Sequence, residues 1–512
     1  MINDTNNHRF VIISKDERMY DILGYSDNGI FDASTAPDAL LAIIAGYNYQ
    51  YNQLLLDTLK EQHKLANTIV EPIPEMIQTQ WNQREPYNND CPLDNEGKRC
   101  VTGCVATAMA QVMKYYKYPQ NGGGGIVSYE SDPFWGPQIG QSFNYDELII
   151  DWNNITDNYG VFSTEVQKAE VAKLMHACGV SVYMDYGSPS SGADDADVAY
   201  AMIHNFGYNP NMYYADKNYY DISEWHALIQ EELKAGRPIL YGSDGHEYIL
   251  DGMNDKGMYH FNFGWAGNGD GHYVLDAITP VGTTLLSDQT MVVGINTSET
   301  GTHKDIFFSD EFQLDTLVKV NNRAKIINLK PMCFSNEANT FNGKARFKGE
   351  YGVGLFDENF NIIKSLYKYK GTFSARSFQG SSASNGNWIS FDAATFVDGK
   401  QYYIAPYAKG DNAPYPTLIR TMSGYEDWYR VTVKSGQVYL ERKKKIQDDS
   451  DMLLGDSNGD GTIDVADIVL LVNYIMLSPS PDFIFINSDM DKDGEIDVAD
   501  IAILIAEIMK QQ

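Results

Sequence analysis

The chain has 512 residues, which is too long for a single hydrophobic core, so several independently packed domains are expected. It carries 39 Lys and Arg against 69 Asp and Glu, a formal net charge of −30. A chain this negative is repelled by phosphate backbones and anionic lipid surfaces, which argues against a nucleic-acid partner. No run reaches the roughly 18 consecutive apolar residues of a membrane-spanning helix, so no membrane span is expected.

The first part of the chain predicts a small α+β unit. Residues 10–13 and 20–25 alternate in polarity like a pair of short strands, and a helical run extends from Pro37 to about Leu59. Residues 67–82 contain two prolines and little periodicity, which predicts an exposed connector that a protease can cut.

The next region, residues 81–295, changes character along its length. Helical patterns dominate its first part, including a run over 105–116 that Pro119 ends, and strand-and-turn patterns dominate its second part. This order predicts an α+β domain in which a helical half precedes a β half.

A cysteine stands at the predicted start of an apolar helix, where Gly103 precedes Cys104. Backbone N–H groups at a helix N-terminus and the helix dipole stabilise a thiolate, so we expect a lowered pKa and a nucleophilic sulfur at Cys104. A buried structural cysteine is the alternative that position alone leaves open.

Downstream polar residues supply partners for this thiol. His246 opens an apolar strand 142 residues after position 104, and papain-type enzymes place their histidine about 130 to 150 residues after the nucleophile. Asn262 could orient the imidazole, and Trp265 could cover it.

At these residues the chain resembles the streptopain family of bacterial cysteine peptidases, from about residue 80 to residue 294. The motifs that carry the resemblance are residues 81–88 (WNQREPYN), 102–108 (TGCVATA), 184–187 (MDYG), 205–209 (NFGYN), 245–246 (GH) and 260–265 (HFNFGW). The resemblance implies a papain-like two-lobed fold and a peptidase that needs no cofactor for catalysis. It assigns Cys104 as nucleophile, His246 as general base and then acid, and Gln83 as a donor to the oxyanion.

The chain departs from the family pattern at one position. Where the family has Asn-Trp-Gly-Trp, this chain has Asn262-Phe263-Gly264-Trp265, so the first indole N–H donor is absent and an aromatic wall remains. His260 and His272 are the rival candidates for the general base.

Four cysteines besides Cys104 make an odd total of five. Cys178 lies in a helical run and is expected in the core, whereas Cys91 and Cys100 could form a disulfide and Cys333 has no assigned role.

Residues 1–76 resemble the later part of the family's pro-segment. This resemblance implies a zymogen whose pro-segment blocks the site until the connector is cut, and a secreted or cell-surface protein whose leader is not in this chain. An ordinary N-terminal domain is the alternative.

Residues 305–442 show short alternating runs separated by Gly, Asn and Ser clusters, which predicts a β-sandwich. A linker rich in charge follows.

Near the C-terminus, residues 461–468 recur as 494–501. Oxygen ligands at alternate positions, glycine at the sixth position and a carboxylate at the twelfth are the pattern of a calcium loop. The predicted ligands of two Ca²⁺ ions are Asp456, Asn458, Asp460, Thr462, Asp464 and Asp467 in the first loop, and Asp489, Asp491, Asp493, Glu495, Asp497 and Asp500 in the second.

This repeat resembles a dockerin module, because no helix precedes either loop. Dockerins bind cohesin domains through the tenth and eleventh loop positions, which are apolar here: Val465-Ala466 and Val498-Ala499. A cohesin-like partner is the prediction, and a purely structural calcium-stabilised tail is the alternative.

The predicted domains are a partial pro-segment (1–76), a papain-like peptidase domain (77–300), a β-sandwich (301–445) and a dockerin-like module (452–512). The predicted function is a secreted cysteine endopeptidase that hydrolyses proteins and is made as a zymogen. Two other functions stay open: an inactive homologue that acts as a surface-binding scaffold, and a thiol acyltransferase.

Overall fold

The structure is a computed structural model of the full chain. It describes residues 1–16, 19–56, 70–131, 138–243, 245–275, 289–298, 307–315, 323–333, 346–374, 387–397, 400–411, 413–422, 426–434, 437–443, 454–457, 462–475, 488, 490 and 498–510. The chain divides into two compact units: residues 1–278 with 284–443, and residues 444–512 with 279–283.

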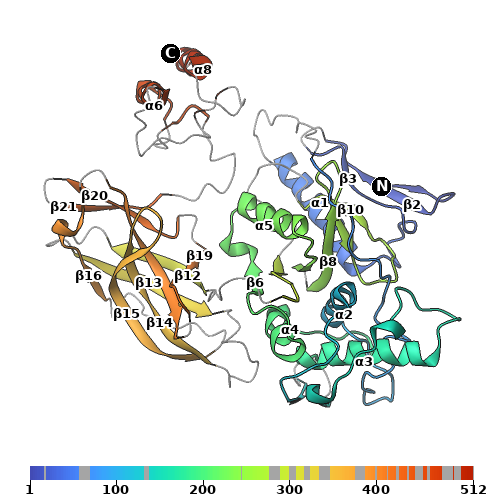
Figure 1. The fold of residues 1–512 in the computed structure, drawn as a ribbon. Coiled ribbons are helices and arrows are strands. Elements are labelled where there is room, and N and C mark those ends of the chain that lie inside the picture. Colours follow the sequence, from blue (N-terminus) through green and yellow to red (C-terminus); the bar gives the residue numbers. More distant parts are fainter. Residues whose placement is uncertain are drawn as a thin grey trace. The chain divides into compact units, whose positions relative to one another are not determined.

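The larger unit contains an antiparallel sheet that is nine-stranded among the described residues (Figure 1). Its strands, in spatial order, are β1 (Ile2–Asp4), β2 (Arg9–Ile13), β3 (Ile22–Ser26), β10 (Gly271–Tyr273), β9 (Tyr259–Asn262), β8 (His246–Met253), β7 (Ile239–Ser243), β11 (Thr290–Val293) and β6 (Tyr213–Asp216). Both predicted N-terminal strands are present, and they extend the sheet beyond β10. Because β3 pairs with β10, the N-terminal segment and the β half share one sheet.

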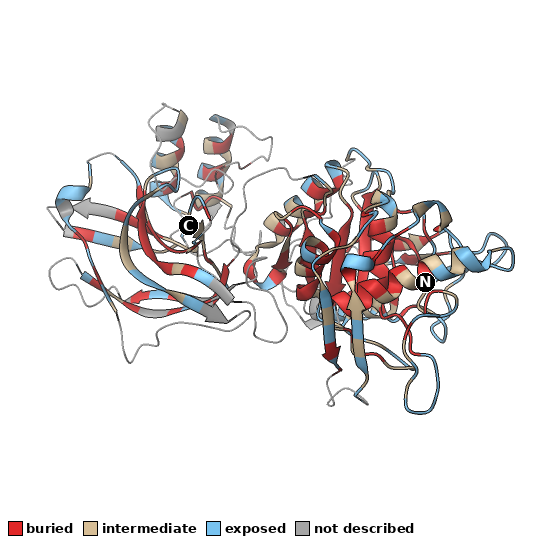
Figure 2. Cartoon of the chain, turned by 60° about the horizontal axis from the view of Figure 1, so that its bottom comes forward, coloured by how far each residue is buried: buried red, intermediate tan, exposed pale blue. Residues whose placement is uncertain are grey.

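The helices of the larger unit are α1 (Asp38–Leu56), α2 (Cys104–Tyr116), α3 (Glu165–Ser181), α4 (Val198–Phe206) and α5 (Ile222–Lys234). Residues Val105–Met113 of α2 are all buried, so this helix is a core element and not an amphipathic surface helix. It packs against α3 and against β8. The buried side chains gather in these helices and in the sheet, while loops carry the exposed ones (Figure 2).

A two-stranded hairpin, β4 (Ile126–Glu130) with β5 (Gly140–Asn144), packs beside α3. The helical elements thus precede most of the sheet in sequence, and the fold is α+β with a helical part followed by a β part, as predicted.

The region after residue 305 is β-rich, as predicted, and forms two sheets. One has the order β16 (Trp388–Ser390), β13 (Arg323–Cys333), β12 (Phe307–Asp315), β19 (Arg420–Thr421). The other has the order β15 (Ile362–Ser374), β14 (Arg346–Phe356), β17 (Tyr402–Gly410), β20 (Tyr429–Lys434), β21 (Gln437–Glu441), with β18 (Thr417–Leu418) on β17. Apolar side chains from both sheets form one core, as in a sandwich.

The β-rich region contacts the preceding α+β region of the same unit through Arg420 and Phe308. The Arg420 guanidinium donates hydrogen bonds of 3.0 and 3.2 Å to the two carboxylate oxygens of Glu224 and lies 4.0 Å from the ring centre of Tyr220. Beside this ion pair, Phe308 packs against Tyr219, with ring centres 4.4 Å apart.

The smaller unit contains α6 (Val465–Ile475) and α8 (Val498–Lys510). They pack on a small core centred on Leu471, Met490 and Leu504. Within the described part of the chain, no helix combines the length and apolar character that crossing a membrane would need.

Candidate active site

Cys104 is the first residue of α2, as predicted, and the preceding glycine explains its placement. Gly103 has φ 85°, a backbone conformation that residues with a side chain rarely adopt. A Cβ at this position would also lie 2.7 Å from the side chain of Met184 and 3.1 Å from the carbonyl oxygen of Ser191. The chain can therefore turn into the helix here, and present the thiol, only with glycine before the cysteine.

Four of the five expected catalytic residues line one cleft of about 1050 Å³: Gln83, Cys104, His246 and Trp265. Trp265 is 37% exposed, which suits a side chain that covers the mouth of the cleft. The peptide N–H of Thr102 donates to the carbonyl oxygen of Gln83 over 3.1 Å, so the glutamine loop is tied to the segment that leads into α2.

The thiol of Cys104 does not have the lowered pKa that its position at a helix start predicts. Burial raises its pKa to about 11, and the nearby charge of Glu247 adds to this effect. The N–H groups of Glu247, Val105 and Cys104 act in the opposite direction but do not outweigh burial.

His246 is not hydrogen-bonded to Cys104 among the described residues. Its Nε2 lies instead 3.9 Å from Oδ2 of Asp38, the first residue of α1, which lines the same cleft. In this arrangement the imidazole faces a carboxylate of the N-terminal segment.

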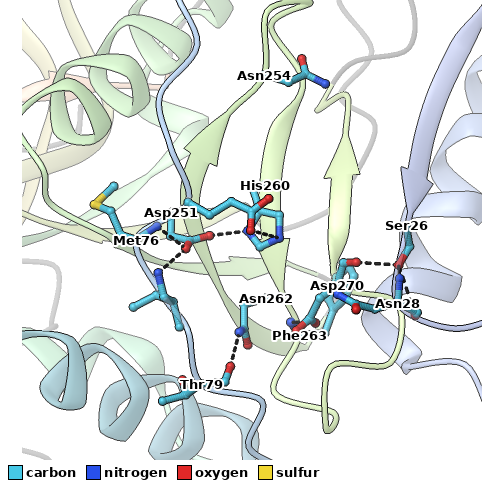
Figure 3. A network of polar contacts seen from close by, with 12 residues as sticks. Ser26, Asn28, Met76, Thr79, Asp251, Asn254, His260, Asn262, Phe263 and Asp270 are labelled. Carbon is cyan, nitrogen blue, oxygen red and sulfur yellow. Dashed lines mark hydrogen bonds and ion pairs between the residues drawn. The ribbon is translucent and has the colours of Figure 1, made fainter. Parts of the chain in front are cut away.

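Asn262 is buried outside the residues that line the cleft. Its Nδ2 donates to the carbonyl oxygen of Thr79 over 2.9 Å (Figure 3). Its Oδ1 accepts from Gln111 Nε2 and from Gly264 N, each over 3.1 Å. The structure therefore does not place Asn262 against the imidazole. Gln111 is a partner that sequence reasoning missed, although a buried polar residue in an apolar helix is a signal that could have found it.

The rival histidines lie elsewhere in the sheet. His260 Nδ1 is 2.6 Å from Asp251 Oδ1, and its Nε2 is 3.7 Å from Glu75 Oε2 (Figure 3). His272 stacks on Tyr25 with ring centres 5.3 Å apart, and burial, aided by the charge of His260, lowers its pKa to about 4. Neither histidine is among the residues that line the cleft.

The same aspartate holds the expected connector against the sheet. Asp251 Oδ2 accepts from the N–H of Met76 and of Ile77 over 2.9 and 2.6 Å, and Ile73 forms a β-bridge with Met253 (Figure 3). The predicted connector keeps exposed side chains at Pro72, Pro74, Glu75 and Gln78, but hydrogen bonds and the β-bridge hold residues 73–77 against β8. Residues 67–69 lie outside the described residues.

The N-terminal segment is held beside the cleft by several buried contacts. Tyr47 of α1 donates to the carbonyl oxygens of Leu23 and Val274 over 2.7 and 2.9 Å, and Ser26 Oγ donates to the carbonyl oxygen of Asp270 over 2.6 Å. These contacts and the β3–β10 pairing fix α1 so that Asp38 reaches the cleft.

The described cysteines besides Cys104 do not pair. Cys91 and Cys100 are both buried free thiols, so the disulfide that sequence reasoning left open does not form. Cys178 is in the core, as predicted, with its Sγ 3.5 Å from Met113 Sδ. Cys333 lies in β13, and its side chain is outside the described residues.

The predicted calcium ligands are only partly described: Asp456, Thr462, Asp464, Asp467 and Asp500. Asn458, Asp460, Asp489, Asp491, Asp493, Glu495 and Asp497 lie outside the described residues.

Both carboxylates at the twelfth loop position are buried. Asp467 Oδ2 accepts from the N–H of Asp464 over 2.9 Å, and Asp500 Oδ1 accepts from the N–H of Met490 over 2.6 Å. In the described part of the chain, no three acidic, His or Cys side chains converge as metal ligands. The described carboxylates are hard oxygen donors, which fit a calcium ion.

Comparisons with known families match three stretches of the chain. Residues 81–273 match the peptidase C10 family, residues 454–509 match the dockerin type I domain, and residues 1–51 match the Spi protease inhibitor family. The C-terminal unit is thus a dockerin-type module.

Streptopain of Streptococcus pyogenes is 32% identical over 291 residues, which cover 53% of this chain and 72% of that protein. The thiol protease/hemagglutinin PrtT of Porphyromonas gingivalis is 29% identical over 56% of this chain and 35% of that protein. The solved structure of a prointerpain A fragment from Prevotella intermedia is 30% identical and covers 57% of this chain and 94% of that one, with a TM-score of 0.50. The chain is a cysteine peptidase and belongs to the peptidase C10 family.

Proposed function

We propose that this chain is a secreted or cell-surface cysteine endopeptidase in which Cys104 is the nucleophile and His246 transfers the proton. The observation that carries the proposal is the cleft that Gln83, Cys104, His246 and Trp265 line together. A cysteine at a helix start, a histidine at a strand start and an amide donor around one cavity are the parts that acyl transfer needs.

The proposed reaction begins when His246 takes the proton of Cys104, and the thiolate attacks the carbonyl carbon of the scissile peptide bond. The side-chain amide of Gln83 and the N–H of Cys104 stabilise the oxyanion that forms. His246 then gives the proton to the leaving amine, the C–N bond breaks, and an acyl-enzyme remains. His246 activates a water molecule that hydrolyses the thioester and restores the free thiol.

Catalysis in this scheme requires an ion pair between His246 and Cys104, and no hydrogen bond joins these two described side chains. Burial raises the pKa of the thiol, which favours its protonated form. Contact with an imidazolium would lower the pKa of the thiol, because an opposite charge favours the ionised form.

We further propose that residues 1–76 keep the enzyme in this state as a pro-segment. The match of residues 1–51 to the Spi protease inhibitor family supports this role, as does the position of Asp38 beside His246. Because residues 73–77 are bonded to β8, a maturation cut is expected before them. Such a cut would leave residues 73–76 attached to the peptidase domain (77–300), which is followed by the sandwich (301–445) and the dockerin-type module (452–512).

The dockerin-type module is proposed to bind two Ca²⁺ ions through the loops named above and to dock a cohesin-like partner. Several apolar side chains of its helices are exposed, among them Val465 and Val498 at the tenth loop positions. Such a surface is suited to a protein partner.

The test compares the full chain with its Cys104→Ala variant on a denatured protein, before and after maturation, and identifies the fragment termini. The proposal expects internal cleavage by the wild-type chain alone, at a much higher rate after maturation. Equal rates before and after maturation would contradict the pro-segment, and cleavage by the Cys104→Ala variant would contradict the nucleophile. Acylated products in place of new carboxyl termini would identify an acyltransferase.

A further inference from the structure

A carboxyl group that the proposed reaction does not use lies in the cleft next to the proposed general base. Glu247 follows His246 on β8, lines the cleft and is only 4% exposed. Its Oε1 is buried and has no hydrogen-bond partner among the described residues. Unpartnered buried carboxyl oxygens are uncommon because their desolvation is costly, so this one needs an explanation.

A glycine on the neighbouring strand makes room for the Glu247 carboxyl group. Gly242 on β7 is the cross-strand partner of Glu247 on β8 and also of Thr290 on β11. A Cβ at Gly242 would have Glu247 Oε2, Asp195 Oδ2 and Thr290 Oγ1 all within 3.0 Å. Three oxygen atoms from three different segments therefore converge over a glycine that has no side chain to occupy the space.

Asp195 brings a second carboxylate to this point. It begins the short 3-10 helix Asp195–Asp197, lines the cleft and accepts a hydrogen bond from the Thr290 hydroxyl. The two carboxyl groups are too few for a metal site: in the described part of the chain no third acidic, His or Cys ligand joins them.

The charged side chains that line the cleft are mostly acidic. The acidic residues that line it are Asp38, Asp185, Asp194, Asp195, Asp197 and Glu247, whereas Arg84 is the single Lys or Arg among the described lining residues. Because a cleft lined by one sign of charge concentrates ligands of the opposite sign, cationic peptides are favoured at its entrance.

We propose that Asp195 and Glu247 form an acidic subsite that selects substrates with an arginine or lysine side chain next to the scissile bond. This inference rests on the proposed peptidase function. The guanidinium or ammonium group would donate to Glu247 Oε1 and to Asp195, which would satisfy the unpartnered oxygen.

The electrostatics of the empty cleft agree with this role. Burial raises the pKa of Glu247 well above its usual range, and the charge of Asp195 adds to the effect. A cation placed against the two carboxyl groups would stabilise their ionised forms, so the subsite interacts more favourably with a basic side chain than with an apolar one.

The first experiment maps cleavage sites. The matured chain is incubated under reducing conditions with a mixture of denatured proteins, and the new termini are identified by mass spectrometry. We expect Arg and Lys to be enriched at one position within about three residues of the cut, since the subsite adjoins the catalytic cleft. The Glu247→Gln variant should lose this enrichment, and Asp255→Asn, which removes an exposed charge from the same lobe, should keep it.

Peptide pairs then measure the effect. Two substrates that differ only by arginine or norleucine at the mapped position are compared by kcat/KM. The ratio of kcat/KM for the arginine substrate to that for the norleucine substrate should fall about tenfold or more in the Glu247→Gln variant. In the wild-type chain, norleucine is disfavoured because it leaves the buried carboxyl groups unpaired. Asp195→Asn should give the same direction of change without altering the residue beside His246. Unchanged ratios in both folded variants would overturn the inference.

A binding measurement separates this inference from the peptidase function. The Cys104→Ala chain is titrated with the same two peptides by fluorescence anisotropy, with and without Glu247→Gln. Cleavage by the wild-type chain without basic preference would overturn the subsite alone. If the Cys104→Ala chain binds the arginine peptide selectively but the matured wild-type chain cleaves nothing, the subsite is supported and the peptidase mechanism is overturned. If there is neither selective binding nor cleavage, the subsite and the peptidase mechanism are both overturned.

Discussion

Asp38 Oδ2 lies 3.9 Å from His246 Nε2, so a carboxylate from the first turn of α1 faces the imidazole at the start of β8. The N-terminal strands extend the catalytic sheet at β10 and position α1, which carries Asp38, beside the cleft. A protonated His246 is attracted to Asp38, and this attraction competes with its ion pair with Cys104. This contact gives the proposed pro-segment a simple electrostatic means of holding the enzyme inactive.

Replacing Asp38 by alanine should therefore activate the full chain. The expected gain is at most about fivefold, because an ion pair as exposed as this one contributes about 1 kcal/mol or less. The rate of Cys104 alkylation by iodoacetamide measures it directly, since Cys91, Cys100 and Cys178 are buried. Asp21→Ala, an exposed acid of the same segment, is the control. A rate equal to that of the wild-type chain would exclude Asp38 as a restraint.

Gln83→Ala should lower kcat by about 100 to 1,000-fold, because it removes one of two donors to the oxyanion, and KM should change little. Steady-state kinetics on a short peptide substrate would measure both constants. Gln78→Ala removes the same amide from an exposed position in the connector and should leave them unchanged. A tenfold rise in KM with kcat intact would instead assign Gln83 to substrate binding.

The buried His260–Asp251 pair should make stability depend on pH. Burial by itself lowers the pKa of His260, but the hydrogen bond and charge of Asp251, with the charges of Glu75 and Asp270, outweigh burial and raise it above 6.5. A raised folded-state pKa means that the stabilisation is complete below about pH 6.5 and is lost as pH rises through the folded value.

The His260→Ala variant tests this pair by thermal unfolding at several pH values. At pH 6 it should be destabilised by about 3 to 5 kcal/mol, because it leaves Asp251 buried without its charged partner. At a pH above the folded-state pKa of His260 the loss should be smaller, since His260 of the wild-type chain is then neutral. His226→Ala, a partly buried histidine near Tyr259, is the comparison. An equal loss at both pH values would show that the histidine is held for packing alone.

Calcium removal should unfold the dockerin-type module. Chelation of the full chain is expected to lower its helical circular dichroism, because α6 and α8 share only a small core and their loops need the ion to bring carboxylates together. Calorimetric titration of the metal-free chain should give two sites. Asp467→Asn and Asp500→Asn should each remove one, whereas Glu358→Gln, an exposed acid of the β-rich region, should keep both. An unchanged spectrum after chelation would count against the calcium loops.

Much of the candidate site could be predicted from local patterns. The start of α2 at Cys104 follows from an apolar run that begins after Gly103, and β8 follows from the apolar run after His246. The calcium loops follow from the spacing of carboxylates within a few residues. Each of these signals depends on short-range geometry, which the order of residues carries directly.

Other features of the site depend on segments far apart in the chain. The sequence did not predict the burial of the Cys104 thiol or the hydrogen-bond partners of Asn262. The lowered pKa expected for Cys104 from its place at a helix start is wrong, because the packing around the thiol buries it and raises its pKa. The structure also places Asp38 beside His246. Asn262 bonds to Gln111 and Thr79, so its position is decided by a helix and a connector that precede it by more than a hundred residues.

The sequence by itself determined the chemistry that this protein can perform: a thiol at a helix start, an imidazole at a strand start, and repeated carboxylates near the C-terminus. Only the tertiary structure decided which groups face one another, including Glu247 with Asp195 over Gly242 and Asp38 with His246. The physical reason is that local geometry follows from neighbouring residues, whereas burial and electrostatic pairing depend on which strands and helices pack together.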